Sequence, residues 1–306
     1  MQQDLHPELE TLLEFFTRQR QAPPQPFVHA PGLIAAPSFY SVQALQAHLN
    51  NPLLSPEWVS VMLRGQAVDL DGTCLWKTAQ TKKLQFMDKA LLDEQLRRGA
   101  AVVLEGIDIL DPDINAFVAG VDAALPCALA ACVAFFSQRD NEAYGGHCDS
   151  DDVLVIQVAG EKRWSLFAPQ QRRYLGNSPL TREQMGRPTA EIVMRAGDAL
   201  LLRAGVPHQC RTQADHSLHL SFDLNDRTPN VEQITHEANT RYNHACAEPY
   251  APAEAVIDRY VDLLRHPDFK RDLQAAQSQI KSNAALFRQR IARAAGVSAL
   301  DRYARK

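Results

Sequence analysis

The sequence lacks the marks of a secreted, membrane-spanning or disulfide-bonded protein. It has no run of about 18 apolar residues, so we expect no membrane-spanning helix. It also lacks a basic N-terminal segment followed by an apolar run, so we expect no secretory signal. Its six cysteines are scattered without a CxxC pair, which favours reduced thiols over a disulfide framework or a zinc knuckle. These absences predict a cytoplasmic protein that does not bind membranes.

A strong charge of either sign is also missing. The formal net charge over 306 residues is −4, whereas proteins that bind nucleic acid are usually basic. We therefore expect no nucleic-acid partner. The hydrophobic fraction of 45% is enough for a full core, and the length fits two domains or one large domain with an appendage.

The pattern along the chain divides it into three segments. Residues 1–54 are expected to form a helical flank, with apolar residues at helical spacing between 4 and 20 and a second helix capped by Ser41. Residues 55–228 are expected to form a larger domain that starts with mixed α/β structure. In that part Asp71-Gly72 indicates a hairpin turn between strands at 68–70 and 74–76. Helices at 88–98 and 111–125 and a strand at 101–104 follow.

Between 128 and 224 the pattern becomes mostly β. The strand candidates are short and are separated by glycine or proline turns, which is typical of a barrel or a sandwich. We interpret Gly160 as a turn that separates two of these strands. The expected strands cover residues 129–136, 153–159, 164–167, 191–194, 199–203, 208–212 and 217–224.

The last segment, residues 229–306, is predicted to be helical and basic. Apolar residues recur on one helical face over 252–266 and again over 270–294. From Arg259 to Lys306 the chain holds eleven lysines and arginines against four aspartates. The simplest interpretation is a solvated helical face, and the alternatives are a dimer arm or a surface that attracts an acidic partner.

A metal-ligand motif occurs within the β-rich part, at His147-Cys148-Asp149. Residues two apart in a strand point to the same side, so the imidazole and the carboxylate can face one metal while Cys148 points away. Two histidines and one carboxylate are the ligand set of non-haem Fe(II) oxygenases, which leaves coordination positions open. A third ligand must come from a distant strand, and His208 is the best candidate because it follows a glycine turn.

The residues around this motif resemble the JmjC/cupin-type oxygenases. The segment after Asp149 contains Gln157, Gly160, Lys162 and Trp164 in the order Q-x-x-G-x-K-x-W. A second block, G-D-x-L-x-x-x-x-G-x-x-H, is matched by Gly197, Asp198, Leu200, Gly205 and His208. The two blocks most resemble the branch that contains the ribosomal-protein histidyl and arginyl hydroxylases. The resemblance covers about residues 55–225.

The resemblance implies a fold, a set of cofactors and a reaction. The fold is a mainly β core, the double-stranded β-helix or jelly roll of JmjC and cupin proteins, with an α/β N-terminal flank and an α-helical C-terminal region. His147, Asp149 and His208 match the Fe(II) ligands, and Lys162 matches the residue that holds the distal carboxylate of 2-oxoglutarate. A lysine one strand along can supply that point charge. The alternative for Lys162 is a solvated lysine beside a glycine turn.

The implied activity is hydroxylation of a side chain in a protein or peptide, with O₂ as oxidant and succinate and CO₂ as coproducts. A free or carrier-bound amino acid or natural product is the alternative substrate, and a metal-binding cupin that does not oxidise is the alternative function. The helices of the resembled hydroxylases form a dimer, so a homodimer through the C-terminal helices is expected. One departure is that no strand-like wing follows these helices, where the resembled hydroxylases carry a winged-helix module.

Three further residues are candidates for contact with the cosubstrate. Tyr144 lies just before the metal motif, where a packing role is the alternative. His219 and Ser221 alternate with apolar residues in the last strand, so both point either into the barrel or into water. We expect the inward orientation; in the outward one His219 is a surface histidine.

Overall fold

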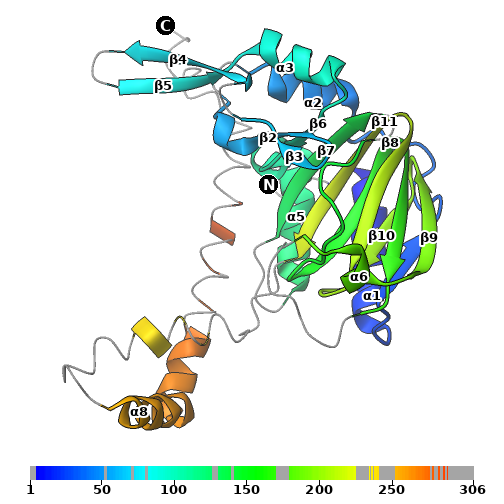
Figure 1. Ribbon diagram of the computed structural model, residues 1–306. Coiled ribbons are helices and arrows are strands. Elements are labelled where there is room, and N and C mark those ends of the chain that lie inside the picture. The colour runs from blue at the N-terminus through cyan, green and yellow to red at the C-terminus, as the bar shows by residue number, and fades with distance from the viewer. Residues whose placement is uncertain are drawn as a thin grey trace, which may run out of the picture.

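The computed structural model describes most of the chain outside a few loops and the C-terminal end (Figure 1). The described residues are 5–51, 54–69, 72–79, 82–125, 130–138, 141–169, 179–224 and 252–275, with single positions between 234 and 240 and between 278 and 288. Within these residues, no helix has the length and apolar character needed to cross a bilayer.

The core of the structure is one large antiparallel sheet that is bent into a barrel (Figure 1). Most of its strands form one continuous series in which each strand pairs with the next. A further strand, β9 (Pro188–Arg195), lies outside this series and pairs with β8. The order is β1 (Phe27–Ala30), β10 (Ala199–Leu202), β8 (Asp152–Phe167), β11 (His208–Leu224), β7 (Ala131–Gln138), β6 (Ala101–Leu104), β2 (Val59–Leu63) and β3 (Gln66–Ala67). The mainly β core expected from the sequence is confirmed.

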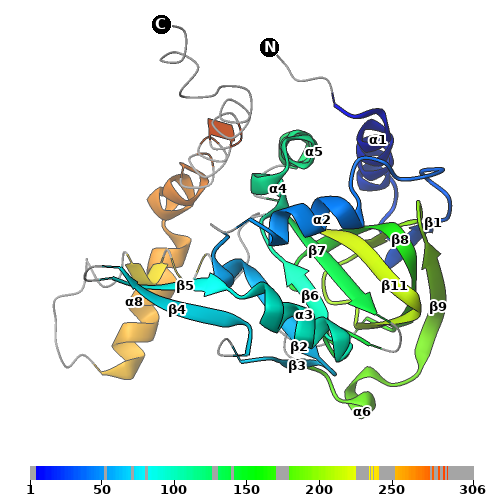
Figure 2. The same ribbon diagram turned by 90° about the horizontal axis from the view of Figure 1, so that it is seen from above.

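Helices cover the outer face of this sheet, and their ends follow from local capping signals (Figure 2). The side chain of Ser41 accepts a hydrogen bond from the Ala44 amide at the start of α2, as its position predicts. Asp88 and Asp111 cap two other helices in the same way. The helices are α1 (Pro7–Gln21), α2 (Val42–Leu49), α3 (Lys89–Arg97), α4 (Ile107–Leu110) and α5 (Pro112–Ala124), and a 3-10 turn, η1, spans Pro56–Trp58.

Two apolar layers result from the alternation of side chains along the strands. The larger layer lies between the sheet and the helices; in it the rings of Phe117 from α5 and Phe222 from β11 are 4.6 Å apart. Burial of such a ring contributes about 1.5–3 kcal/mol. The smaller layer fills the barrel interior and includes Val155, Trp164 and Leu200. The polar side chains that share this interior face are therefore enclosed.

Four of the expected short strands form only two long strands, because each pair is continuous in the structure. The interpretation of Gly160 as a turn that separates two strands is therefore wrong. β8 and β11 each run without interruption, and Gly160 lies inside β8 with φ +66°. The register between the two strands shifts between Thr212 and Ser217, opposite this glycine. A residue with positive φ produces a bulge that bends a strand without ending it.

The hairpin predicted at Asp71-Gly72 is also wrong. Val68 lies outside any strand, and Asp71 lies outside the described residues. The tight turn falls instead at Arg64-Gly65, where both residues have positive φ, between β2 and β3. β4 (Cys74–Ala79) pairs with β5 (Lys82–Met87) in a separate two-stranded sheet.

The ends of the chain differ in how they join the barrel. The expected helical flank also contributes β1, which pairs with β10 in the main sheet. At the other end, α8 (Ala253–Arg265) stands apart from the barrel and has no buried residue (Figure 1). The domain boundaries at 54/55 and 228/229 remain predictions.

Candidate metal and cosubstrate site

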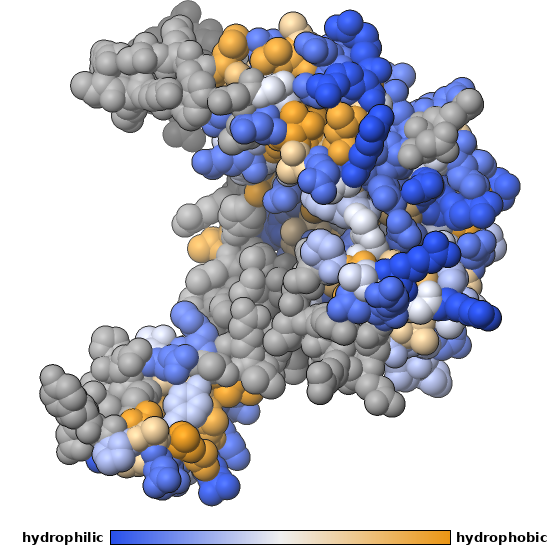
Figure 3. All heavy atoms as spheres, viewed as in Figure 1, coloured by the Kyte–Doolittle hydropathy of each residue, from blue (hydrophilic) through white to orange (hydrophobic). Residues whose placement is uncertain are grey.

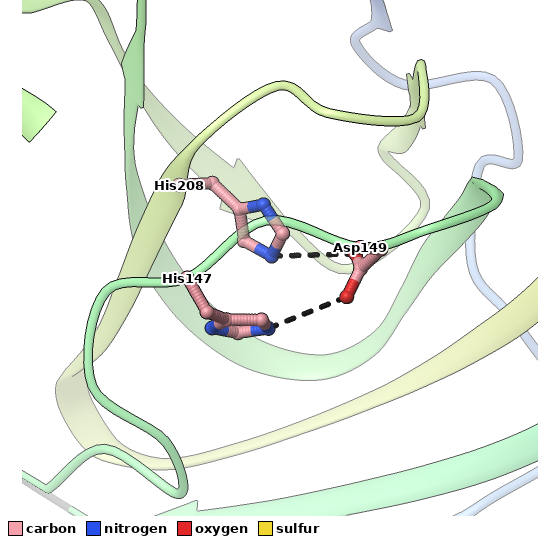
Figure 4. Close-up of side chains that lie close together, drawn as sticks. All are labelled: His147, Asp149 and His208. Atoms are coloured by element: carbon pink, nitrogen blue, oxygen red, sulfur yellow. Dashed lines mark ion pairs between the residues drawn. The ribbon is translucent and has the colours of Figure 1, made fainter. Parts of the chain in front are cut away.

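The structure brings His147, Asp149 and His208 together at one end of the barrel interior (Figure 4). Their ligand-type atoms all lie within 4.8 Å of one another. The backbones of the two histidines form an antiparallel bridge, with N–O distances of 3.0 and 2.8 Å. The Gly205 amide donates to the carbonyl of Asp149 at 2.9 Å, which ties the turn before His208 to the metal-ligand motif. The strand expected at the motif is absent: His147 forms only an isolated bridge, and Asp149 precedes β8.

Hydrogen bonds to the backbone orient both imidazoles in the same way. Nδ1 of His147 lies 2.9 Å from the carbonyl oxygen of Gly145, and Nδ1 of His208 lies 3.1 Å from that of Val206. A carbonyl only accepts, so each Nδ1 carries a proton and each Nε2 is the ring atom that faces Asp149. The two Nε2 atoms lie 3.5 and 3.6 Å from the separate oxygens of Asp149. Histidines that bind metal are commonly oriented by such a second hydrogen bond.

The protonation tendencies of the three groups suit a cation. Burial, together with the nearby His147, lowers the pKa of His208 to about 4 despite the opposing charge of Asp149. Burial alone would raise the pKa of Asp149, but the hydrogen bond from His147 and the charges of both histidines lower it. Burial acts to lower the pKa of His147 as well, but its contacts with Asp149 raise it. An ionised carboxylate and a neutral His208 therefore coexist at neutral pH.

Lys162 is fully buried deeper in the same interior. Burial lowers the pKa of its ammonium, while Cys210 and Glu142 oppose that shift. Its one hydrogen bond within the described residues goes from Nζ to the Ser137 hydroxyl at 3.1 Å, and no carboxylate forms an ion pair with it there. The solvated lysine considered from the sequence is wrong. A buried cation without a counter-ion is costly, which indicates a site for an anion.

Two hydroxyl groups beside Lys162 were missed by the sequence analysis. Ser137 of β7 and Thr212 of β11 are fully buried, and their hydroxyl oxygens are 2.5 Å apart. Thr212 lies directly opposite Lys162 in the strand register. The sequence gives little indication of their role. Ser137 is a polar residue at the end of an apolar strand, but its distance from Lys162 in sequence gives no sign that the two side chains meet.

His219 and Ser221 point into the barrel, as expected. The His219 ring is 2% exposed and stacks on Phe135 with centroids 4.8 Å apart, while the edge of Trp164 contacts its other side at 5.6 Å. Burial, followed by the charges of Lys162 and His208, keeps the pKa of His219 well below its usual range. Its Nδ1 has no hydrogen-bond partner among the described residues. Because Nδ1 is enclosed, this neutral ring carries one buried polar atom that its neighbours leave unsatisfied.

Tyr144 lies at the mouth of the site and is 37% exposed. Its ring is 6.1 Å from that of His147 and 6.1 Å from that of Phe135. Burial of part of the ring raises the pKa of its hydroxyl, and the nearby Glu105 adds to that shift. Tyr144 is therefore placed to meet a substrate that approaches the metal motif from outside.

Two arginines that could replace Lys162 as anion anchors are engaged elsewhere. Arg203 forms an ion pair with Asp152 at 2.6 Å, and Arg163 lies 3.5 Å from Glu191 with its side chain 43% exposed. Gln157 donates its amide nitrogen to the Ala159 carbonyl and to the Ser217 hydroxyl, whereas its buried Oε1 has no hydrogen-bond partner among the described residues.

Comparison with known proteins confirms the resemblance for part of the chain. Residues 116–234 match the JmjC domain family. The bifunctional lysine-specific demethylase and histidyl-hydroxylase NO66 of Drosophila persimilis is 34% identical over 92 residues, 29% of this chain. The NO66 protein of Aedes aegypti is 30% identical over 95 residues. These alignments span only 13% and 15% of the relatives' own lengths.

Solved structures share the fold over most of the chain. The structure of ycfD from Escherichia coli matches 88% of this chain and 71% of its own with a TM-score of 0.54 at 15% identity. A structure of the Escherichia coli ribosomal oxygenase YcfD in complex with cobalt and 2-oxoglutarate covers 82% of this chain and 66% of its own, with a TM-score of 0.50 at 14% identity. At this identity the likeness concerns the fold alone.

Proposed function

We propose that this protein is an Fe(II)- and 2-oxoglutarate-dependent dioxygenase that hydroxylates a side chain of a protein or peptide. The observation that carries the proposal is the pairing of two features in one barrel. A cluster of two histidines and one aspartate lies at one end, and further in lies a buried lysine that pairs with no carboxylate of the described part of the chain. A metal-binding cupin that does not oxidise has no use for that cation.

The donor set fits a divalent iron. His147, Asp149 and His208 would hold the metal on one face, and imidazole with carboxylate suits Fe(II), leaving positions for a bidentate keto acid and O₂. Both Nδ1 atoms are engaged with backbone carbonyls, so Nε2 is the atom through which each imidazole would bind the metal. When bound, the iron with its keto acid supplies the oxidising chemistry that no side chain can provide.

The cosubstrate would lie between this cluster and Lys162. The ammonium would bind the distal carboxylate of 2-oxoglutarate, with the hydroxyls of Ser137 and Thr212 beside it. His219 and Ser221 line the intervening wall, where the free Nδ1 of His219 can meet a ligand oxygen. The ring of Phe135, which stacks on His219, and the ring of Trp164, which makes an edge contact with it, hold His219 in place and exclude water.

The substrate is proposed to be a protein or peptide side chain that passes Tyr144. The support comes from the relatives, which are described as a histidyl-hydroxylase and a ribosomal oxygenase. Because those alignments span small parts of NO66 and the YcfD likeness concerns fold, the substrate of this chain needs its own experiment.

The test is 2-oxoglutarate turnover with purified protein, Fe(II) and fractionated cell extract, read by succinate release, O₂ uptake and +16 Da mass shifts. His147→Ala, Asp149→Ala and His208→Ala should each abolish turnover. Each should also weaken the binding of Co(II), and calorimetry measures this affinity independently of turnover. His216→Ala is the matched control, since His216 is exposed on the same strand as His208. Full metal binding and turnover in any one ligand variant would remove that residue from the set.

The products separate the remaining functions. A mass shift on a peptide supports the proposed substrate class, and a shift on a free or carrier-bound amino acid replaces it with the alternative substrate. Metal binding without succinate release would show a cupin that does not oxidise. A protein that binds neither metal nor 2-oxoglutarate would end the proposal.

We also propose that the protein works in the cytoplasm as a homodimer formed through its C-terminal helices. The described cysteines are all free thiols, as in a reducing compartment.

The proposed dimer rests on α8. In this helix Ile257 is 60% exposed, and apolar side chains gather on it (Figure 3). Exposed apolar faces of this kind commonly mark interfaces. Light scattering should give a dimer for the wild type and a monomer for Ile257→Asp; a monomeric wild type at tens of micromolar would refute the dimer.

A further inference from the structure

A second cluster of charged groups is buried on the outer side of the sheet, away from the metal motif. It contains two carboxylates, Asp108 from α4 and Asp122 from α5, and one guanidinium, that of Arg288. Arg288 is 4% exposed, although it belongs to the basic C-terminal segment and lies 166 and 180 residues from the two aspartates in sequence. The proposed oxygenase function does not use these groups.

The guanidinium meets three separate acceptors. Its Nε donates to Asp122 at 3.3 Å, one terminal nitrogen donates to Asp108, and the other donates to the backbone carbonyl of Ala130. A guanidinium presents its donors in a rigid planar fork, so one arginine can satisfy acceptors on several sides. An ammonium is a point charge on a flexible stem and cannot reproduce this arrangement.

The barrel domain holds the acceptors in place. The second oxygen of Asp122 accepts from the Ala130 amide at 2.7 Å, and the second oxygen of Asp108 accepts from the Cys132 amide at 2.9 Å. Asn115 donates to the Asp108 carbonyl at 2.9 Å. Burial raises the pKa of Asp122, while the Ala130 amide and Arg288 oppose that rise. Two buried carboxylates side by side need a cation, because removal of the cation leaves uncompensated charge in the interior.

We propose that Asp108, Asp122 and the Ala130 carbonyl form an arginine-binding socket, distinct from the metal centre, through which Arg288 fastens the C-terminal segment to the oxygenase domain. The socket closes on the start of β7, the strand that carries Ser137 at its far end. The chain between β11 and Arg288, which includes α8, is then anchored to the domain at both ends. Arg271 of the same segment pairs with Asp268 and Asp272 at the surface, whereas the partners of Arg288 are buried carboxylates of the barrel domain.

The experiment compares Arg288→Ala and Arg288→Lys with Arg271→Ala in the full-length protein. Arg271 is the matched control, because it is an arginine of the same segment whose side chain is 69% exposed. Thermal unfolding should show a clear drop in Tm for Arg288→Ala, a smaller one for Arg288→Lys and none for Arg271→Ala. Hydrogen exchange at the Ala130 and Cys132 amides should speed up in the same order.

Chemical rescue tests the socket as a binding site. Millimolar n-propylguanidinium, which replaces the removed side chain, should restore part of the Tm of Arg288→Ala and leave the wild type unchanged. Tetramethylammonium should not restore it, and neither compound should rescue the double variant Asp108→Asn/Arg288→Ala.

Two results would overturn the socket. One is a Tm and an exchange pattern for Arg288→Ala equal to those of Arg271→Ala. The other is equal rescue by the two cations. If Arg288→Ala does not fold even with n-propylguanidinium, Arg288→Lys decides: wild-type exchange at Ala130 and Cys132 in that variant would refute the need for a guanidinium.

Discussion

Replacement of Lys162 by methionine should affect cosubstrate affinity and stability in opposite ways. Methionine keeps most of the chain length and removes the charge. Lys162 is fully buried, and among the described residues it donates only to the neutral Ser137 hydroxyl, so its remaining donors can bind a carboxylate. A hydrogen bond to a charged group contributes about 1.5–3 kcal/mol, which corresponds to a roughly 10- to 150-fold rise in the Kd for 2-oxoglutarate.

The stability of the ligand-free protein should change in the other direction. A buried ammonium without a counter-ion opposes folding, and a thioether chain of similar shape does not. Lys162→Met should therefore raise the Tm in the absence of 2-oxoglutarate. A purely structural lysine would give a lower Tm and an unchanged Kd.

The assay is anaerobic calorimetry of 2-oxoglutarate binding to the Co(II)-loaded protein, combined with thermal unfolding of the ligand-free form. 2-Oxobutyrate is the ligand control because it lacks the distal carboxylate; its affinity should be the same for the wild type and Lys162→Met. An unchanged 2-oxoglutarate Kd would refute the anchor. So would an equal loss of affinity for both keto acids, which would indicate a disturbed metal centre.

Three further predictions follow from groups near the site. Ser137→Ala removes a neutral partner of Lys162, worth about 0.5–1.5 kcal/mol, so the KM for 2-oxoglutarate should rise roughly 2- to 13-fold at nearly constant kcat; an unchanged KM would contradict this role. Because the folded-state pKa of His219 is lowered, the unfolded chain binds the extra proton, so stability should fall as pH drops below about 6.5, by about 1.4 kcal/mol per unit. Urea titrations should show a weaker acid loss in His219→Gln and the full loss in His216→Gln. A Cβ at Gly160 would lie 1.9 Å from the His216 carbonyl oxygen, so Gly160→Ala should lower the Tm far more than Gly186→Ala, where positive φ is present but no atom lies within 4 Å; equal Tm values would show that the bulge can relax.

The features predicted from sequence depend on local patterns. The cap at Ser41 follows from spacing alone, because capping acts over two or three residues. His147 and Asp149 lie close together, as predicted, but the segment that carries them is not the strand on which that prediction relied. His208 required the order of two motif blocks from the resembled family. The cluster is therefore the part of the site that the sequence predicts best.

The features that the sequence could not predict depend on which distant residues meet. Gly160 has the signal of a turn, but only the partner strand decides that the chain continues through it as a bulge. Ser137 next to Lys162 and Arg288 between two aspartates join residues 25 to 180 positions apart. No periodicity reports such contacts, since each residue alone has the pattern of an ordinary polar position.

The uninterrupted course of β8 and β11 sets the distance between the two ends of the proposed cosubstrate pocket. His208 pairs with Leu166 and Thr212 pairs with Lys162, so the metal end and the cation end are four residues apart on the same two strands. At about 3.3 Å per residue, one inserted residue would move every later side chain to the opposite face. An insertion or deletion of two residues would keep the side chains on the same face. It would, however, change the distance between the metal end and the cation end by about 6.6 Å, which is more than a dicarboxylate longer or shorter by one carbon requires. A relative that binds a dicarboxylate one carbon longer or shorter is therefore expected to differ at the position of Lys162 or its hydroxyl neighbours, and to keep the strand lengths of this chain.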